Sequence, residues 1–241
     1  MEKRPQALLL KFPGTNCDAE TRRALELVGF GTTLLPTAEL TPRHLEPADL
    51  VLFSGGFSYG DYIMAGRLAQ LRLEEKVGGA LKEFVAAGGC LLGICNGFQI
   101  LTKTGLLPGG SLIDNSSGRF VCRWAGLRVE APESPFLQGV PRELELPVAH
   151  AEGRFVSERA VQELRDAGAI ALTYAENFNG SAAAIAGLQD ETGRVLGLMP
   201  HPERFLHRRH HYDPDWQGEG ERGTGYSFFQ SIYQHLLSPT S

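Results

Sequence analysis

The sequence has few cysteines: four among 241 residues, at positions 17, 90, 95 and 122. They include no Cys-x-x-Cys pair and form no paired framework with histidines, which argues against a structural zinc site and a disulfide scaffold. The short apolar run at residues 7–12 lacks the length and the flanks of a signal peptide or a membrane span. We therefore expect a soluble protein of the reducing cytoplasm, with no metal site and no membrane partner.

Basic residues are not in excess either. The formal net charge of −5 and a pI near 5.8 give no electrostatic reason to expect nucleic acid or an anionic membrane as a partner. The sequence contains neither a Gly-x-x-x-x-Gly-Lys-Ser/Thr motif nor a dinucleotide fingerprint, so nothing in it predicts a cradle for nucleotide phosphates. A small polar substrate or another protein is the expected partner, and no cofactor is expected on this chain.

Short apolar runs alternate with helical patterns in the first hundred residues. Strands are predicted at residues 7–12, 32–35, 49–53 and 90–94, and helices at residues 18–28 and 76–87. This alternation is typical of a flavodoxin-like, doubly wound α/β sheet with helices on both faces. Ligands of such sheets bind at the carboxyl ends of the strands, where Gly55, Gly56 and Cys95 all fall.

The pattern changes after residue 118. Antiparallel strands are predicted at residues 119–124, 127–130 and 143–148, followed by a hairpin of residues 182–188 and 195–199. Residues 207–223 are polar and rich in turn formers, which predicts a mobile or partner-facing loop. Residues 226–237 are predicted to form a final helix. We expect a mixed sheet within one domain, residues 1–241.

One segment indicates the chemistry. Residues 93–97 read GICNG, with an apolar run on either side, which predicts a nucleophile at a sharp turn from strand to helix. Glycines two residues before and after Cys95 allow the tight turn, and the helix amino terminus favours a thiolate. Because a free thiol is only a few per cent ionised at neutral pH, Cys95 requires a neighbouring base.

His201 is the best candidate for that base. Pro200 and Pro202 restrict the backbone on both sides of it, and Glu203 can hydrogen-bond one ring nitrogen while the other takes the thiol proton. Cys95, His201 and Glu203 are therefore the predicted catalytic residues. Backbone N–H groups of three further residues can supply donors for an oxyanion, namely Gly55, Gly56 and Asn96.

The chain resembles the class I glutamine amidotransferases, and among them the separate glutaminase subunits that serve purine biosynthesis. Five runs carry the resemblance: PGTNCD at 13–18, GGFSYGDY at 55–62, GICNGFQIL at 93–101, PVAHAEG at 147–153 and MPHPER at 199–204. Ser54 stands where the family pattern has proline, and Ala151 where it has glycine. Neither departure removes a reacting group.

The resemblance implies that Cys95, His201 and Glu203 hydrolyse L-glutamine through a cysteinyl thioester, and that Gln99 helps to hold the substrate. It also implies that ammonia passes to a large ATP-dependent synthase subunit, accompanied by a third small subunit. That partner, which carries ATP and Mg²⁺, converts formylglycinamide ribonucleotide to formylglycinamidine ribonucleotide. Two alternatives remain open: a stand-alone cysteine amidase or γ-glutamyl hydrolase, and a non-catalytic glutamine-binding regulatory subunit.

Other polar residues receive more ordinary interpretations. His150 and Glu152 are expected to have a structural or binding role rather than a catalytic one, and the sequence does not decide whether Asp61 touches substrate or partner. The histidines at 207, 210 and 211 are interpreted as a solvated loop rather than a metal cluster, because no thiols or acids accompany them at ligand spacing. The cysteines at 17, 90 and 122 are interpreted as packing residues.

Overall fold

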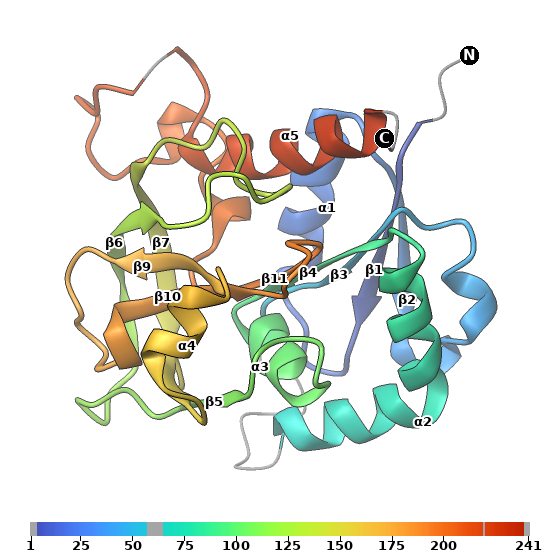
Figure 1. The fold of residues 1–241 in the computed structure, drawn as a ribbon. Helices are drawn as coiled ribbons and strands as arrows, with labels where there is room; N and C mark the ends of the chain where they lie inside the picture. The colour runs from blue at the N-terminus through green and yellow to red at the C-terminus, as the bar shows by residue number, and fades with distance from the viewer. Residues whose placement is uncertain (1–3, 57–64, 219, 239–241) are drawn as a thin grey trace.

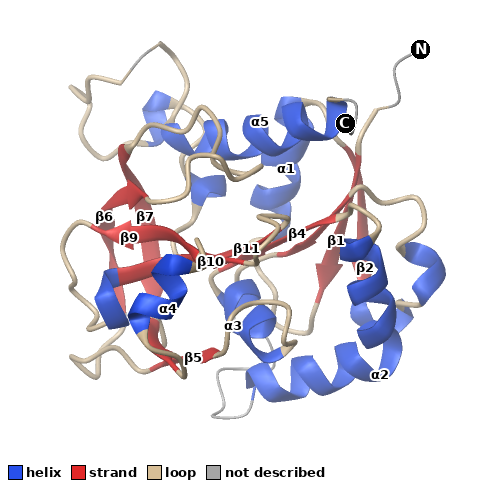
Figure 2. Cartoon of the chain, viewed as in Figure 1, coloured by secondary structure: helices blue, strands red, loops and turns tan. Residues whose placement is uncertain are grey.

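The computed structural model describes residues 4–56, 65–218 and 220–238. A nine-stranded mixed sheet runs through the molecule in the order β2-β1-β3-β4-β11-β10-β9-β6-β7 (Figures 1 and 2). Its strands are β1 (Gln6–Lys11), β2 (Gly31–Pro36), β3 (Leu50–Phe53), β4 (Cys90–Ile94), β6 (Val121–Val129), β7 (Glu143–His150), β9 (Ile170–Tyr174), β10 (Ile185–Gln189) and β11 (Val195–Leu198). A separate antiparallel pair joins β5 (Gly110–Ile113) to β8 (Arg154–Ser157).

The first half of the sheet is parallel, and its inner strands are buried on both faces. Strands β1, β3, β4 and β11 pair in parallel, and every residue of β3, β4 and β11 is buried. Helices α1 (Asp18–Val28) and α5 (Thr224–Leu237) cover one face, whereas α2 (Ala65–Ala86) and α3 (Asn96–Lys103) cover the other (Figure 1). The order 2-1-3-4 followed by one more strand is that of flavodoxin-like sheets, so the predicted fold class is confirmed.

The second half is antiparallel and differs in detail from the prediction. The strands predicted at residues 119–124 and 127–130 are one continuous strand, β6, which pairs with β7 without interruption through Gly126. Residues 182–184 form a 3₁₀ turn before β10, and α2 begins at residue 65 rather than 76. The sequence interpretation missed β5, β8, β9 and α4 (Val161–Asp166).

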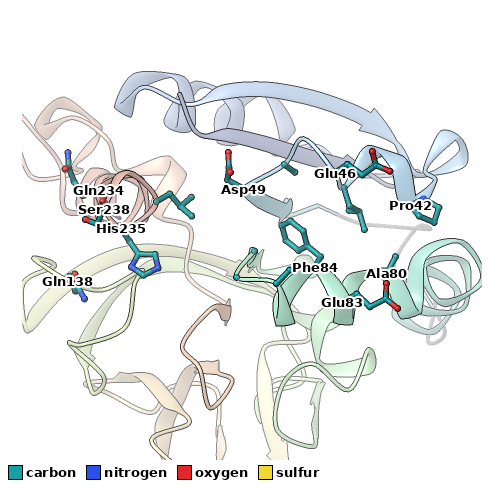
Figure 3. A pocket seen from close by; sticks show the side chains of 16 residues that line it. Pro42, Glu46, Asp49, Ala80, Glu83, Phe84, Gln138, Gln234, His235 and Ser238 are labelled. Atoms are coloured by element: carbon teal, nitrogen blue, oxygen red, sulfur yellow. Dashed lines mark hydrogen bonds between the residues drawn. The ribbon is translucent and has the colours of Figure 1, made fainter. Parts of the chain in front are cut away.

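A cavity of about 1000 Å³ lies at the amino ends of β3 and β4 (Figure 3). Asp49 and Gly89, which precede these strands, line it together with Phe84 of α2 and His235 of α5. It is therefore at the edge of the sheet opposite to Cys95, which follows the carboxyl end of β4. Among the described residues, no helix is both long and apolar enough to cross a bilayer.

Candidate active site

Cys95 occupies a strained turn between β4 and α3. Its φ of 52° and ψ of −107° lie outside the regions that residues other than glycine usually adopt, a conformation that costs of order 1–3 kcal/mol. The chain passes so close to itself here that a Cβ on Gly97 would lie 2.0 Å from the Phe53 carbonyl oxygen, and one on Gly93 would lie 2.6 Å from the Gly97 oxygen. Glycine is thus required at both flanking positions, as the sequence predicted.

The Cys95 sulfur lies at the carboxyl edge of the sheet, in a pocket of about 240 Å³. Its thiol donates to the Ala149 carbonyl oxygen at 3.8 Å, and the side chain is 7% exposed. The first N–H groups of a helix have no partner within the helix; in α3 those of Phe98 and Gln99 donate to the Cys95 carbonyl oxygen, so the N–H groups of Asn96 and Gly97 are the candidate donors beside the sulfur. Besides Cys95 and Ala149, the pocket is lined by Asn16, Cys17, Gly56, Gln99, Phe120, Cys122, His150, Ala151, Glu152, His201 and Arg204.

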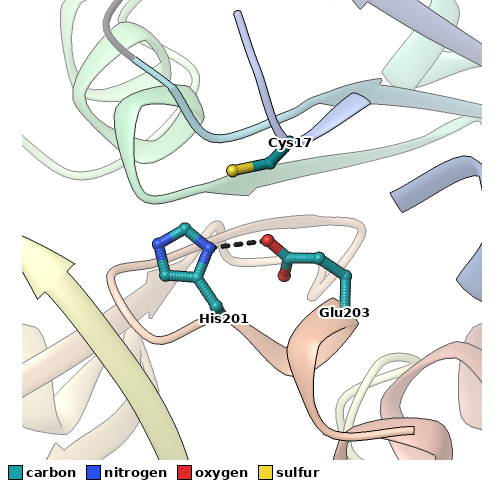
Figure 4. A group of neighbouring side chains, drawn as sticks. All are labelled: Cys17, His201 and Glu203. Atoms are coloured by element: carbon teal, nitrogen blue, oxygen red, sulfur yellow. Dashed lines mark hydrogen bonds and ion pairs between the residues drawn. The ribbon is translucent and has the colours of Figure 1, made fainter. Parts of the chain in front are cut away.

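His201 and Glu203 form a buried pair beside this pocket. The His201 ring nitrogen Nδ1 lies 2.6 Å from Glu203 Oε1 (Figure 4), and both side chains are almost completely buried. Because an ionised carboxylate can only accept, Nδ1 carries a proton, so Nε2 is the ring nitrogen left to exchange a proton with another group. Nε2 finds no hydrogen-bond partner among the described residues, which leaves it available to exchange a proton with a thiol.

The surroundings of His201 favour its protonated form. Burial works against the charged imidazolium, but Glu203 outweighs it, with further contributions from Cys95 and Cys17, and the pKa of His201 is raised well above its ordinary value. A protonated His201 opposite a negatively charged sulfur is the ion pair that activates a cysteine nucleophile. The fold thus brings the three predicted catalytic residues, Cys95, His201 and Glu203, to one edge of the sheet.

Gly55 and Gly56 follow β3 on the other side of the imidazole. A Cβ on Gly55 would lie 2.8 Å from His201 Cε1, and Gly56 has a φ of +150° with the backbone of Asn16 against it. Side chains at these positions would displace the base or the neighbouring turn. The backbone thus approaches the site closely at Gly55 and Gly56. That the N–H groups of Gly55, Gly56 and Asn96 serve as oxyanion donors stays a prediction.

Gln99 connects α3 to the segment that follows β7. Its Nε2 donates to the Glu152 carbonyl oxygen at 2.7 Å, and its Oε1 accepts from Asn96 Nδ2 at 2.8 Å. Gln99 therefore links two parts of the pocket wall, and Ala151, one of the two departures from the family pattern, also lies in that wall. The predicted contact of Gln99 with substrate stays a prediction.

His150 is locked in place by Asn115. Asn115 Nδ2 donates to the carbonyl oxygens of Arg119 and His150, so its Oδ1 must be the acceptor for His150 Nδ1 at 3.0 Å and for the Gly153 N–H. Burial, together with the charge of His201, lowers the pKa of His150 to about 4. A neutral, firmly held imidazole suits the structural or binding role that we predicted, rather than that of a base.

Cys17 and Arg204 are the site residues that sequence reasoning missed. Cys17, predicted to be a packing residue, precedes α1 at the carboxyl end of β1, and its sulfur accepts a hydrogen bond from Arg204 Nη2 at 3.0 Å. Figure 4 shows this sulfur directed at the His201–Glu203 pair. Cys122 also lines the pocket and is exposed, whereas Cys90 is a core residue whose pKa burial raises to about 12. The available signal was the position of Cys17 at the end of the turn that follows β1, directly before α1.

The other histidines do not gather into a metal cluster within the described part of the chain, where the one group of potential ligands is Cys17, His201 and Glu203. The prediction that His211 lies in a solvated loop is wrong, because its side chain is buried. Its Nε2 lies 3.4 Å from Glu145 Oε2, and its ring packs against Phe205 and Trp216. Asp61 lies outside the described residues.

Comparison with known proteins identifies the family. The profile of the CobB/CobQ-like glutamine amidotransferase domain matches residues 4–236. The chain belongs to the glutamine amidotransferase family. Within the family, the chain is 42% identical to the protein of Dehalococcoides mccartyi named "Phosphoribosylformylglycinamidine synthase subunit PurQ", over 93% of this chain and 94% of that protein. A protein of Synechococcus sp. (strain JA-3-3Ab) with the same name is 44% identical over 95% of this chain and 96% of its own length.

A solved structure extends the comparison to an assembly. The chain superposes on a chain from "Structure of PurLQS from Thermotoga maritima" with a TM-score of 0.81 and 36% sequence identity, covering 97% of this chain and 100% of that one. These similarities confirm the resemblance to amidotransferases of the PurQ type that the sequence motifs indicated.

Proposed function

We propose that this chain hydrolyses L-glutamine to glutamate and supplies the released ammonia to an ATP-dependent partner subunit. The observation that carries the proposal is the convergence of three groups at one sheet edge: a sulfur at a strained elbow, an imidazole with a free Nε2, and a carboxylate that holds the other ring nitrogen. That arrangement comprises a nucleophile, a base and a group that orients the base.

The reaction begins with attack of the Cys95 thiolate on the side-chain carboxamide carbon of glutamine. The resulting oxyanion accepts hydrogen bonds from backbone N–H groups at the start of α3 and at Gly55–Gly56. His201 then gives its Nε2 proton to the departing nitrogen, which leaves as ammonia, and a thioester remains on Cys95. In the second half, His201 takes a proton from water, the hydroxide attacks the thioester, and glutamate and the thiol are released.

Cys95 is a better nucleophile than Cys17, although both precede helices at this edge. The Cys17 sulfur is held by Arg204 Nη2 and also bonds to Asn16 Oδ1 at 3.3 Å, and its side chain is only 1% exposed. Cys95 lies at the strained turn, and the backbone N–H groups beside its sulfur can donate hydrogen bonds to the oxyanion of a tetrahedral intermediate.

The ammonia has a defined destination in this proposal. The partner is a large synthase subunit that converts formylglycinamide ribonucleotide to formylglycinamidine ribonucleotide in purine biosynthesis, and a third small subunit completes the complex. ATP and Mg²⁺ are bound by the large subunit, since the chain itself has no phosphate-binding motif. The names of the relatives and of the superposed assembly support this partner set. The four free cysteines support a cytoplasmic location.

The test is a comparison of two nitrogen sources in the reconstituted complex. We expect Cys95→Ala to lower glutamine-dependent synthesis by about 10⁴-fold or more, as loss of a nucleophile does in another triad hydrolase, while synthesis from added ammonium persists. Cys122→Ser, which changes an exposed thiol of the same pocket, is the control and should retain both activities. Loss of both activities in Cys95→Ala would show that Cys95 has a structural role. If Cys17→Ser abolished glutamine-dependent synthesis and Cys95→Ala did not, Cys17 would be the nucleophile.

The same assay separates the alternatives. We expect the isolated chain to hydrolyse glutamine slowly and to be stimulated by the partner, because free hydrolysis would waste glutamine. Rapid hydrolysis without any partner would support a stand-alone amidase or γ-glutamyl hydrolase. Absence of hydrolysis in both settings would support a glutamine-binding regulatory subunit.

A further inference from the structure

A second thiol lies against the His201–Glu203 pair, and the proposed hydrolysis does not use it. Potential ligand atoms of Cys17, His201 and Glu203 all lie within 4.8 Å of one another (Figure 4). All three residues are buried, with side chains at most about 2% exposed. Glu203 Oε2 and His201 Nε2 have no hydrogen-bond partner among the described residues, so neither atom is committed to another group.

This donor set matches the preferences of one class of metal ion. Zinc binds cysteine sulfur, histidine nitrogen and carboxylate oxygen at roughly 2.0–2.3 Å, so ligand atoms in a tetrahedral site lie roughly 3.3–3.8 Å apart. The observed upper limit of 4.8 Å is about an ångström larger, a difference that side-chain rotation can close. Hard cations such as Mg²⁺ and Ca²⁺ prefer sites made of oxygen and would be excluded by the thiolate.

The cluster is connected to solvent through the catalytic pocket. Cys17 and His201 both line the cavity of about 240 Å³ that also contains the Cys95 sulfur. An ion that enters there can keep a water as its fourth ligand, as zinc does in open sites. Arg204, which donates to the Cys17 sulfur, is partly exposed and can move its guanidinium aside.

We propose that Cys17, His201 and Glu203 form a binding site for Zn²⁺ or another divalent cation that favours thiolate, and that occupancy of this site switches the glutaminase off. Binding replaces the thiol proton of Cys17 and one imidazole proton of His201 with the metal, and both protons go to solvent. The metal occupies the imidazole and the carboxylate that hydrolysis requires. Removal of the ion by a chelator restores them.

Cobalt binding by the purified full-length chain tests the site directly. Co²⁺ replaces Zn²⁺ in such sites and gives a near-ultraviolet charge-transfer band when a thiolate is a ligand. We expect one Co²⁺ per chain, a charge-transfer band, and displacement of the Co²⁺ by one equivalent of Zn²⁺. Cys17→Ser should abolish the band and weaken Zn²⁺ binding, measured calorimetrically, by more than the roughly 10- to 100-fold that loss of an outer-shell partner costs.

Two further variants distinguish this site from other thiols. Cys95→Ser and Cys122→Ser should both keep the band, because neither residue belongs to the three-residue cluster. Cys17→Ala is examined in parallel, and thermal melting of each variant shows whether it is folded. A band that disappears in Cys95→Ser but persists in Cys17→Ser would overturn the proposal, and so would the absence of Co²⁺ and Zn²⁺ binding at micromolar concentrations.

The binding measurement does not depend on the hydrolysis of glutamine. If the chain hydrolyses glutamine, stoichiometric Zn²⁺ should inhibit it at least tenfold, and a chelator should reverse the inhibition. Inhibition of equal strength in Cys17→Ser would show that the metal acts elsewhere and would also overturn the proposal.

Discussion

At the scale of single residues, the Glu203 carboxylate determines which nitrogen of His201 faces the nucleophile. The 2.6 Å contact of Oε1 with Nδ1 fixes the tautomer, and the negative charge stabilises the imidazolium that forms during thiol deprotonation. Glu203→Gln keeps the shape but removes the charge. We expect kcat for glutamine to fall by about 10²–10⁴-fold while KM changes little, measured by glutamate release in the complex. A change confined to KM would instead assign Glu203 to substrate binding.

His150 should make the stability of the fold depend on pH. Its pKa of about 4 in the folded chain lies below the value of about 6.5 in the unfolded chain, so the unfolded chain binds the proton first as the pH falls. His150 therefore contributes stability above pH 6.5 that is lost progressively toward pH 4, to a limit of about 3 kcal/mol.

The measurement compares the wild-type chain with His150→Gln in urea unfolding at several pH values between 7 and 4. The difference in the free energy of unfolding between the two proteins should shrink as the pH decreases. Parallel stability profiles would mean that His150 does not carry this dependence.

The limits of sequence-based prediction are visible in the two thiols of the site. Cys95 could be predicted because its neighbours, Gly93 and Gly97, are local and serve one backbone turn. Cys17 could not, since its contact with Arg204 joins residues 187 positions apart and depends on the strand order β1-β3-β4-β11. Local motifs indicate a nucleophile, whereas the groups that surround it follow from topology.

At the scale of elements, the packing of α3 on β3 depends on a missing side chain. A Cβ on Gly97 would lie 2.0 Å from the Phe53 carbonyl oxygen. Because this oxygen belongs to the backbone of β3, it cannot move away without displacing the strand. We expect Gly97→Ala to cost about 1–3 kcal/mol or more, as overpacking does, and to displace the start of α3 together with Cys95. Thermal unfolding and glutamate release should therefore decline together.

Gly79→Ala is the matched control, because Gly79 lies in α2 with nothing within 4 Å of an added Cβ. There the loss of backbone freedom in the unfolded chain should stabilise the protein by about 0.5–1 kcal/mol. If both substitutions changed the melting temperature in the same direction, close packing of α3 would not be the explanation.

The parallel half of the sheet could be predicted more fully than the antiparallel half, for a physical reason. Strands β3 and β4 are buried on both faces and appear as continuous apolar runs. Strand β6 mixes exposed and buried residues and contains Gly126, which suggested a break that pairing with β7 does not require. Residues 207–223 were predicted to form a mobile or partner-facing loop. A bridge joins His207 to Arg222 near the two ends of this segment, and Trp216 within it packs against Phe205. The mobility of the segment stays a prediction.

At the scale of the whole molecule, one sheet joins the parallel and antiparallel halves. Strand β11 pairs with β4 on one side and with β10 on the other, and α5, at the end of the chain, packs on α1, near its beginning. Neither half can therefore lose its structure without exposing buried strands of the other. We expect a single cooperative unfolding transition, although the chain is longer than those that usually behave in this way.

The two tryptophans make this expectation measurable. Trp124 and Trp216 both contact Phe205, so their fluorescence reports on the antiparallel side and the chain after β11. Circular dichroism in the far ultraviolet is dominated by helices, and α1, α2 and α3 cover the parallel half. Urea midpoints from the two signals should coincide. Separate midpoints would show that the halves unfold independently, and the site would then lie on a boundary between two units, since Cys95 belongs to one half and His150 to the other.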